Sequence, residues 1–135
     1  MTRYDQPDGH LHGVMVACQR HDGRWLLIRR SESVPAPLKV CFPGGGIDEG
    51  EDQETAVMRE MQEELNAVVT PLQCVWHYRW PERHLTLWGW RATLHSSALM
   101  PSPEEVHEVL WLTADEAINH PDALPNTDAF LNACL

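Results

Sequence analysis

Three glutamates, Glu60, Glu63 and Glu64, are the residues whose spacing most directly suggests chemistry. At about 100° per residue of an α-helix, their carboxylates fall within an arc of roughly 100°. Like charges at these spacings oppose helix formation, so we expect a positive group beside them. Carboxylates and exposed backbone oxygens are ligands for a hard cation such as Mg²⁺. The cluster therefore predicts a divalent-cation site, and the alternative is the solvated acidic face that is common in glutamate-rich helices.

The segment before these glutamates is a glycine run over residues 44–46, which allows the backbone to approach the acidic face closely. Glu51 and Arg59 are spaced so that they can pair if the glycine loop folds back onto the helix. Such a pair would hold the loop and the helix together. This spacing favours a pre-organised cation site over a solvated helix face.

The acidic cluster belongs to a predicted amphipathic helix over residues 52–66. Asp52 is a suitable N-cap, because its carboxylate can accept a backbone N–H of the first turn. Val57, Met61 and Leu65 recur every four residues and form an apolar stripe. We therefore expect one face of the helix to pack on the core and an adjacent face to present the carboxylates.

Residues 45–67 resemble the Nudix box, a family motif with fixed spacing. The matching positions are Gly45, Glu51, Arg59, Glu60, Met61, Glu63 and Glu64. The chain departs from the family pattern at Asn66, where a glycine is usual, and at Ala67, where a larger aliphatic residue is usual. Asn is the residue after glycine that best tolerates the left-handed conformation at a helix end. Neither departure touches the acidic residues.

The resemblance implies a metal-dependent hydrolase that cleaves the pyrophosphate bond of a nucleoside diphosphate linked to another group. It implies that Mg²⁺ (or Mn²⁺) is held by Glu60, Glu63, Glu64 and the carbonyl of Gly44. Glu51 and Arg59 would orient the loop and the helix. A carboxylate of the cluster would position the water, or the general base would lie in a later loop, at Glu104 or Glu105.

Within the family, the chain is most similar to the MutT-type hydrolases of oxidised nucleotides, through residues 42–45, 80–88 and 125–126. This similarity implies substrate binding by Arg30, Gly45, Arg83 and Asn126, and a (d)NTP or 8-oxo-dGTP-like substrate hydrolysed to NMP and pyrophosphate. An Asn side chain can read a purine edge because it carries a donor and an acceptor. Helix N-capping is the alternative role of Asn126.

Three alternatives to this function stay open at this point. One is a Nudix hydrolase acting on ADP-ribose, a dinucleoside polyphosphate or a nucleotide sugar. The second is a nucleotide-binding Nudix module without catalysis, and the third is a purely structural acidic helix. A nucleotide panel with product identification would separate the first from the triphosphate hydrolase, because the products differ.

The length and charge of the chain limit its partners. With 135 residues it is expected to form one domain, residues 1–135. A net charge of −10 argues against a nucleic-acid polymer or an anionic membrane as partner and leaves a small nucleotide. No apolar run approaches the roughly 20 residues that span a bilayer. Four scattered cysteines without a C-x-x-C pair indicate free thiols and a reduced, cytoplasmic location. The expected state is a monomer or a homodimer.

The order of predicted elements is strands, the central helix, more strands and short C-terminal helices. This order indicates an α+β fold, a mixed sheet with helices on its faces, in agreement with the α/β/α sandwich that the resemblance implies. Strands are predicted over residues 14–18, 25–28, 40–42, 72–80, 84–94 and 109–112, and C-terminal helices after Thr113 and after Asn126. Residues 1–9 read as a loose arm, and His10 and His12 as exposed.

Overall fold

The computed structural model describes residues 9–96 and 98–135, so the expected arm over residues 1–8 lies outside the described part. The elements are β1 Leu11–Ala17, β2 Trp25–Arg30, β3 Val40–Cys41, β4 Gly44–Gly46, α1 Gln53–Leu65, β5 Val69–Trp80, the 3₁₀ helix η1 Pro81–Arg83, β6 Leu85–Leu94, β7 Val106–Leu112, α2 Ala114–Ile118 and α3 Thr127–Cys134. The predicted element order is confirmed, while β5 and β7 each begin three residues earlier than predicted.

The strands form two sheets where the sequence predicted one. The first is mixed, in the order β4-β1-β6-β5, with β1 and β6 parallel. The second is antiparallel, in the order β3-β2-β7. A turn at Asp22-Gly23, a residue pair typical of hairpins, connects β1 and β2, but their pairing is limited to the bridge between Gln19 and Trp25. Beyond that bridge β1 and β2 enter different sheets, which local turn signals do not reveal.

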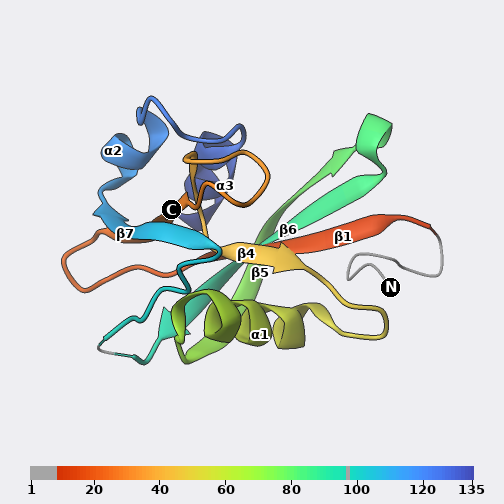
Figure 1. Cartoon of the computed structure of the whole chain (residues 1–135), viewed down its shortest axis with the longest axis horizontal. Coiled ribbons are helices and arrows are strands. Elements are labelled where there is room, and N and C mark those ends of the chain that lie inside the picture. The colour runs from red at the N-terminus through yellow and green to blue at the C-terminus, as the bar shows by residue number, and fades with distance from the viewer. Residues whose placement is uncertain (1–8, 97) are drawn as a thin grey trace.

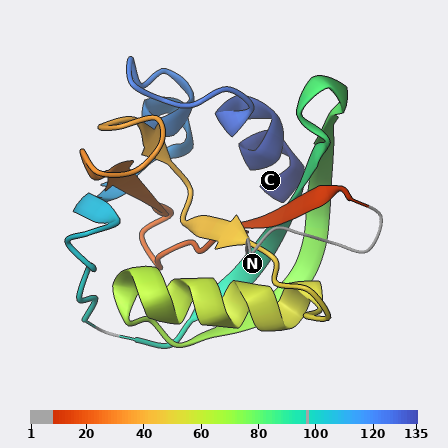
Figure 2. The same cartoon turned by 45° about the vertical axis from the view of Figure 1, so that its right-hand side comes forward.

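Helices cover both faces of the mixed sheet (Figure 1, Figure 2). Helix α1 lies on one face, and α3, with α2 beside it, lies on the other. Side chains alternate between the two faces along β6. Trp88 and Trp90 pack against the hydrophobic cluster that includes Val57 and Met61 of α1, whereas Leu85 and Leu87 line a cavity on the α3 side. The α+β sandwich expected from the element order is therefore confirmed.

Helix α1 begins and ends as its sequence predicts. The Asp52 carboxylate accepts the backbone N–H of Thr55 at 2.8 Å, and the apolar stripe from Val57 to Leu65 is fully buried. At the other end, Asn66 adopts the left-handed conformation with φ 52°, and its side-chain amide donates to the Met100 carbonyl at 2.7 Å. The helix is thus fixed at both ends by side chains that its own sequence supplies.

The prediction that His10 is exposed is wrong. Its side chain is buried, and its Nε2 lies 2.8 Å from the hydroxyl of Thr86. His12 is half-buried and accepts a hydrogen bond from the indole N–H of Trp88 at 3.2 Å. Both histidines belong to the α1 face of the sheet because β1 pairs with β6 in register. Long-range pairing therefore buries residues that the local sequence leaves ambiguous.

The four cysteines are free thiols, as predicted. Cys18, Cys41 and Cys134 are buried, whereas Cys74 is half-buried. Burial raises the pKa of the Cys18 thiol to about 12 and that of Cys41 to about 11. Among the described helices, none is both long enough and apolar enough to cross a bilayer.

Candidate functional site

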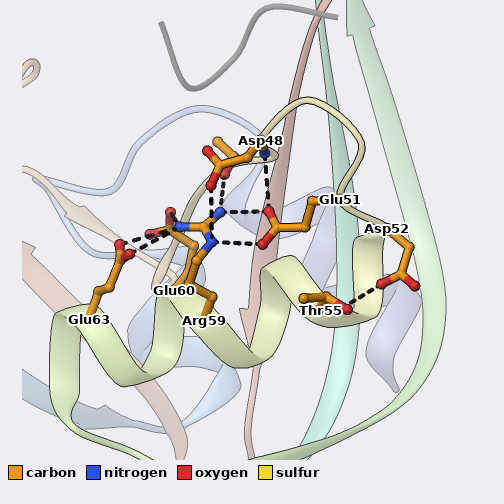
Figure 3. A network of polar contacts seen from close by, with 8 residues as sticks. Asp48, Glu51, Asp52, Thr55, Arg59, Glu60 and Glu63 are labelled. Atoms are coloured by element: carbon orange, nitrogen blue, oxygen red, sulfur yellow. Dashed lines mark hydrogen bonds and ion pairs between the residues drawn. The ribbon is translucent and has the colours of Figure 1, made fainter. Parts of the chain in front are cut away.

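The positive group beside the glutamate cluster is the guanidinium of Arg59 (Figure 3). Its Nε and Nη2 each donate to one oxygen of Glu51 at 2.8 Å, and Nη2 also donates to the Gly46 carbonyl. Its Nη1 donates to Glu60 at 2.8 Å and to Glu63 at 3.3 Å. Hydrogen bonding to Glu51, the largest cause, raises the pKa of Arg59. The predicted pairing of Glu51 with Arg59 is therefore present and ties the loop before α1 to the helix.

The three glutamates of α1 differ in their surroundings. Glu60 and Glu64 are buried, at 2% and 6% exposure, whereas the Glu63 side chain is 42% exposed. Glu64 accepts the backbone N–H of Gly44 at 2.7 Å. Burial raises the pKa of Glu64 to about 8, although that hydrogen bond lowers it, and the charges of Glu60 and Glu105 raise it further. The cluster is thus a partly desolvated set of carboxyl groups rather than a solvated face.

Strand β4 brings the glycine run against this cluster. It pairs with β1, and its Gly45 lies so close to α1 that a Cβ at this position would overlap the Glu60 carboxylate. Only a residue without a side chain lets the backbone approach the carboxylate in this way. The predicted close approach of the glycine loop to the acidic face is therefore present.

The loop before β7 contributes a further carboxylate. The backbone N–H of Ser31 donates to the Glu105 carbonyl at 3.1 Å, and the Ser31 hydroxyl donates to the Glu104 carbonyl at 2.7 Å. The Glu105 Oε2 atom is buried and has no hydrogen-bond partner in the described part of the chain. Glu104 is exposed. Of the two residues predicted for this loop, the structure places Glu105 against the cluster.

A cavity of about 530 Å³ lies on the α3 side of the mixed sheet, next to the glycine run. Its floor is apolar and comes from β1 and β6. The lining residues are Leu11, Gly13, Val14, Met15, Arg30, Pro35, Ala36, Cys41, Phe42, Gly44, Gly45, Trp80, Arg83, Leu85, Leu87, Leu124, Pro125 and Thr127. The cavity therefore joins segments from the whole chain, and most of its walls carry no motif that the sequence reveals.

Three of the residues expected to bind substrate line this cavity: Arg30, Gly45 and Arg83. Arg30, at the end of β2, donates through Nε to the Pro35 carbonyl at 2.7 Å. Its charge also lowers the pKa of Glu64, so the acidic cluster is within its electrostatic reach. Arg83 is exposed on η1. Two guanidinium groups, from β2 and from η1, therefore border the cavity.

Asn126 does not line the cavity, although Pro125 and Thr127 on either side of it do. It occupies the N-cap position of α3 in the left-handed conformation, with φ 74°, and its side chain makes no capping hydrogen bond. Capping by the side chain, the alternative role for Asn126, is therefore wrong. Asn126 is half-buried and lies between two residues that line the cavity.

The chemistry of the donors fits a hard divalent cation. Glu60 and Glu64 are buried carboxylates, and Glu105 adds a buried oxygen that has no hydrogen-bond partner among residues 9–96 and 98–135. A cation would relieve the mutual repulsion of these groups. In the arrangement described, however, Arg59 engages Glu60 and Glu63, and no three His, Cys, Asp or Glu side chains within residues 9–96 and 98–135 are arranged to hold a metal ion. Loading the site would require carboxylates to turn away from Arg59.

Sequence reasoning missed two parts of the site. Asp48 lies beside Arg59, 3.4 Å from Nε, and completes the ring of acidic groups around the guanidinium. Pro35 and Ala36 form a cavity wall from a segment that the sequence shows only as a proline-containing loop. The position of Asp48 inside the glycine loop was a usable signal, whereas nothing local marks the wall.

Comparison with known proteins gives consistent matches. The NUDIX domain model matches residues 9–134. The 8-oxo-dGTP diphosphatase of Escherichia coli (strain K12) is 39% identical over 57% of this chain and 62% of that protein. The RNA pyrophosphohydrolase of Caulobacter vibrioides (strain NA1000 / CB15N) is 47% identical over 53% of this chain and 41% of that protein. The chain thus spans from about two fifths to about three fifths of the length of these curated relatives.

The fold also matches solved structures. The crystal structure of the MutT protein from Methanosarcina mazei Go1 superimposes with a TM-score of 0.78 and covers 93% of each chain at 19% sequence identity. At that identity the match concerns the fold alone. The domain match and the structural match each cover nearly all of the described residues.

Proposed function

Because the chain belongs to the Nudix family, we propose that it is a metal-dependent pyrophosphohydrolase acting on a nucleoside diphosphate-X bond. The proposed reaction converts a (d)NTP or an 8-oxo-dGTP-like nucleotide to NMP and pyrophosphate. The observation that carries the proposal is that the buried carboxylates of Glu60 and Glu64 lie against Gly45 and Gly44, two residues that line an apolar cavity. Phosphate groups and a flat apolar base would find matching surroundings in that arrangement.

The proposed cofactor is Mg²⁺ or Mn²⁺, held by Glu60, Glu63, Glu64 and the carbonyl of Gly44. When bound, such an ion polarises phosphoryl oxygens and lowers the pKa of a bound water. The hard oxygen donors, two of them buried, support this assignment. The role of Glu51 and Arg59 is to hold the glycine loop on the helix, which their two hydrogen bonds support.

Glu105 is our candidate for the group that accepts a proton from the attacking water. Its Oε2 is buried without a hydrogen-bond partner in the described part of the chain, and its charge acts on Glu64. A general base must reach the proton that it removes, so a carboxylate already facing the cluster suits this role. Glu104, the other residue predicted for the loop, is exposed and has less support.

For substrate recognition we propose that Arg30 binds phosphate oxygens and that Arg83 borders the base. Arg30 lines the cavity and its charge lowers the pKa of Glu64, which supports a position beside the phosphates of a bound nucleotide. Asn126 is the proposed reader of the base edge, and its side chain is free of the N-cap role. Its amide lies outside the cavity lining, so this assignment depends on reorientation when a base binds.

The substrate class rests on charge as well as on the cavity. The net charge of −10 favours a small nucleotide over a nucleic-acid polymer. Against this, one of the relatives is named as an RNA pyrophosphohydrolase. ADP-ribose, a dinucleoside polyphosphate and a nucleotide sugar remain the alternative substrates. A cytoplasmic location and a monomeric or homodimeric state remain predictions.

A panel of nucleotides with Mg²⁺ or Mn²⁺, with the phosphate product identified, tests the proposal. Turnover of a triphosphate to NMP and pyrophosphate would support it, and absence of turnover on every nucleotide would refute it. Binding without turnover would favour a non-catalytic module. Glu63→Gln is the cleanest variant, because Glu63 is exposed and its loss should leave the fold intact. We expect kcat to fall by about 10²-fold or more, in line with electrostatic and metal contributions to catalysis.

A further inference from the structure

Gly89 and Phe130 form an unusually close contact between β6 and α3. A Cβ placed on Gly89 would lie 2.5 Å from Cε1 and 2.6 Å from Cδ1 of the Phe130 ring. A glycine inside a strand often marks a place where another group approaches the backbone closely. Here the approaching group is the side chain by which α3 is anchored to the sheet, and Phe130 is fully buried.

The Phe130 ring is buried between other aromatic rings. It stacks on Trp76 with ring centroids 5.7 Å apart, and Phe42 meets it edge-on at 4.8 Å. Trp76 lies directly opposite Gly89 in the β5–β6 register, so the ring packs on both residues. Because buried side chains are closely packed, an added methyl group at position 89 must lift the ring and, with it, the helix.

The distance between α3 and the sheet affects the width of the cavity. Thr127, the first residue of the helix and one turn before Phe130, is buried and lines the cavity together with Pro125. On the sheet below, Leu87 lines the opposite side and shares with Gly89 one face of β6. The separation between this wall and this floor is therefore set beside the cavity, at the contact of Gly89 with Phe130.

We propose that Gly89 is a specificity-determining positioning residue, which through Phe130 sets the width of the base end of the cavity. Gly89 does not line the cavity, and it acts through the helix that carries the wall. The inference rests on the proposed function, because it assigns this end of the cavity to the base and the acidic end to the phosphates. It predicts that changes at Gly89 alter the binding of the base selectively.

The test compares wild type with Gly89→Ala, Phe130→Leu and the double variant. Binding is measured by calorimetry for pyrophosphate and for the tightest-binding of the four common deoxynucleoside monophosphates. We expect Gly89→Ala to weaken monophosphate binding by about tenfold, the effect of disturbing apolar contacts in a pocket. Pyrophosphate binding should change by less than about twofold, as for remote substitutions. Phe130→Leu in the Gly89→Ala background should restore most of the loss, because it removes the ring edge that the methyl meets.

Three outcomes would overturn the inference. They are unchanged monophosphate affinity in folded Gly89→Ala, an equal loss for both ligands, and failure of Phe130→Leu to restore binding. Thermal melting of each variant shows whether it is folded. If Gly89→Ala does not fold, Phe130→Leu against wild type tests the same contact, because a smaller side chain removes the ring that holds α3 above Gly89 and should also change monophosphate binding more than pyrophosphate binding. A wild type that binds neither ligand refutes the proposed function itself, whereas normal wild-type binding with an unaffected Gly89→Ala refutes only the role of Gly89.

Discussion

Arg59 and Glu51 are joined by two parallel hydrogen bonds, Nε to Oε2 and Nη2 to Oε1, each 2.8 Å long (Figure 3). The Glu51 carboxylate also accepts the backbone N–H of Asp48 at 3.0 Å. One side chain thus connects the turn after the glycine run with the middle of α1. A planar guanidinium matches a carboxylate in this geometry, which a lysine cannot reproduce.

Replacing Glu51 by Gln should destabilise the protein and lower its activity. The amide retains one acceptor oxygen but turns N–H donors toward Arg59, so one guanidinium N–H loses its acceptor. The loss should be about 1–3 kcal/mol in the free energy of unfolding, the range for a partly buried hydrogen bond to a charged group. Urea unfolding measures it. Glu54→Gln, on the exposed first turn of the same helix, is the matched control and should have little effect. Equal stability of the two variants would contradict the structural role of Glu51.

The local parts of this molecule could be predicted from its sequence, because they depend on spacing within one segment. The N-cap Asp52, the apolar stripe of α1 and the pairing of Glu51 with Arg59 are all present. The family resemblance of residues 45–67 is confirmed by the domain match, and the α+β fold by the solved structures. The cap, the stripe and the ion pair each depend on residues that are no more than eight positions apart in the sequence.

The remainder depends on pairing between distant segments. The division into two sheets follows from the partners that β1 and β2 find in β6 and β7, more than 70 residues downstream. For the same reason His10 is buried, Glu63 is more exposed than its neighbours Glu60 and Glu64, and Pro35 faces a cavity. Helical spacing gives the direction of a side chain, but it does not show which element covers it.

Replacing Glu105 by Gln should weaken metal binding, because it removes a buried negative charge beside Glu64. We expect the dissociation constant for Mn²⁺ to rise about 10–100-fold, the effect typical of residues that support metal ligands. Without metal, the melting temperature should rise, since one like charge has been removed from the cluster.

The neighbouring Glu104→Gln is the matched control for this experiment. Glu104 carries the same charge but is exposed, so Mn²⁺ binding should remain close to that of the wild type. Calorimetric titration of the three proteins at one pH and one salt concentration gives the comparison. If both variants weaken Mn²⁺ equally, the effect is one of net charge, and the assignment of Glu105 to the cluster fails.

Asp52 should make the stability of α1 depend on acid pH. The backbone N–H of Thr55, which donates to its carboxylate at 2.8 Å, holds the pKa of Asp52 below its usual range. A depressed pKa in the folded state stabilises the protein above the unfolded pKa of about 3.9, and this stabilisation disappears as the pH falls through the folded pKa. Asp52→Asn retains a capping oxygen but does not titrate. The stability difference between the two proteins, measured by urea unfolding, should therefore shrink from about pH 6 to about pH 3. A difference independent of pH would exclude this contribution.

Asn66, the C-cap of α1, is one of the two positions at which the chain departs from the family pattern, and its role can be tested. Its φ of 52° is costly for most side chains, and its amide compensates by donating to the Met100 carbonyl at 2.7 Å. Asn66→Ala loses the hydrogen bond and keeps the left-handed backbone, so we expect a loss of about 1–2 kcal/mol in the free energy of unfolding. Asn66→Gly also loses the hydrogen bond but relieves the backbone, so its stability should lie within about 0.5 kcal/mol of the wild type. Denaturant unfolding of the three proteins distinguishes these cases. Equal losses for Ala and Gly would assign the whole effect to the hydrogen bond and none to the backbone conformation.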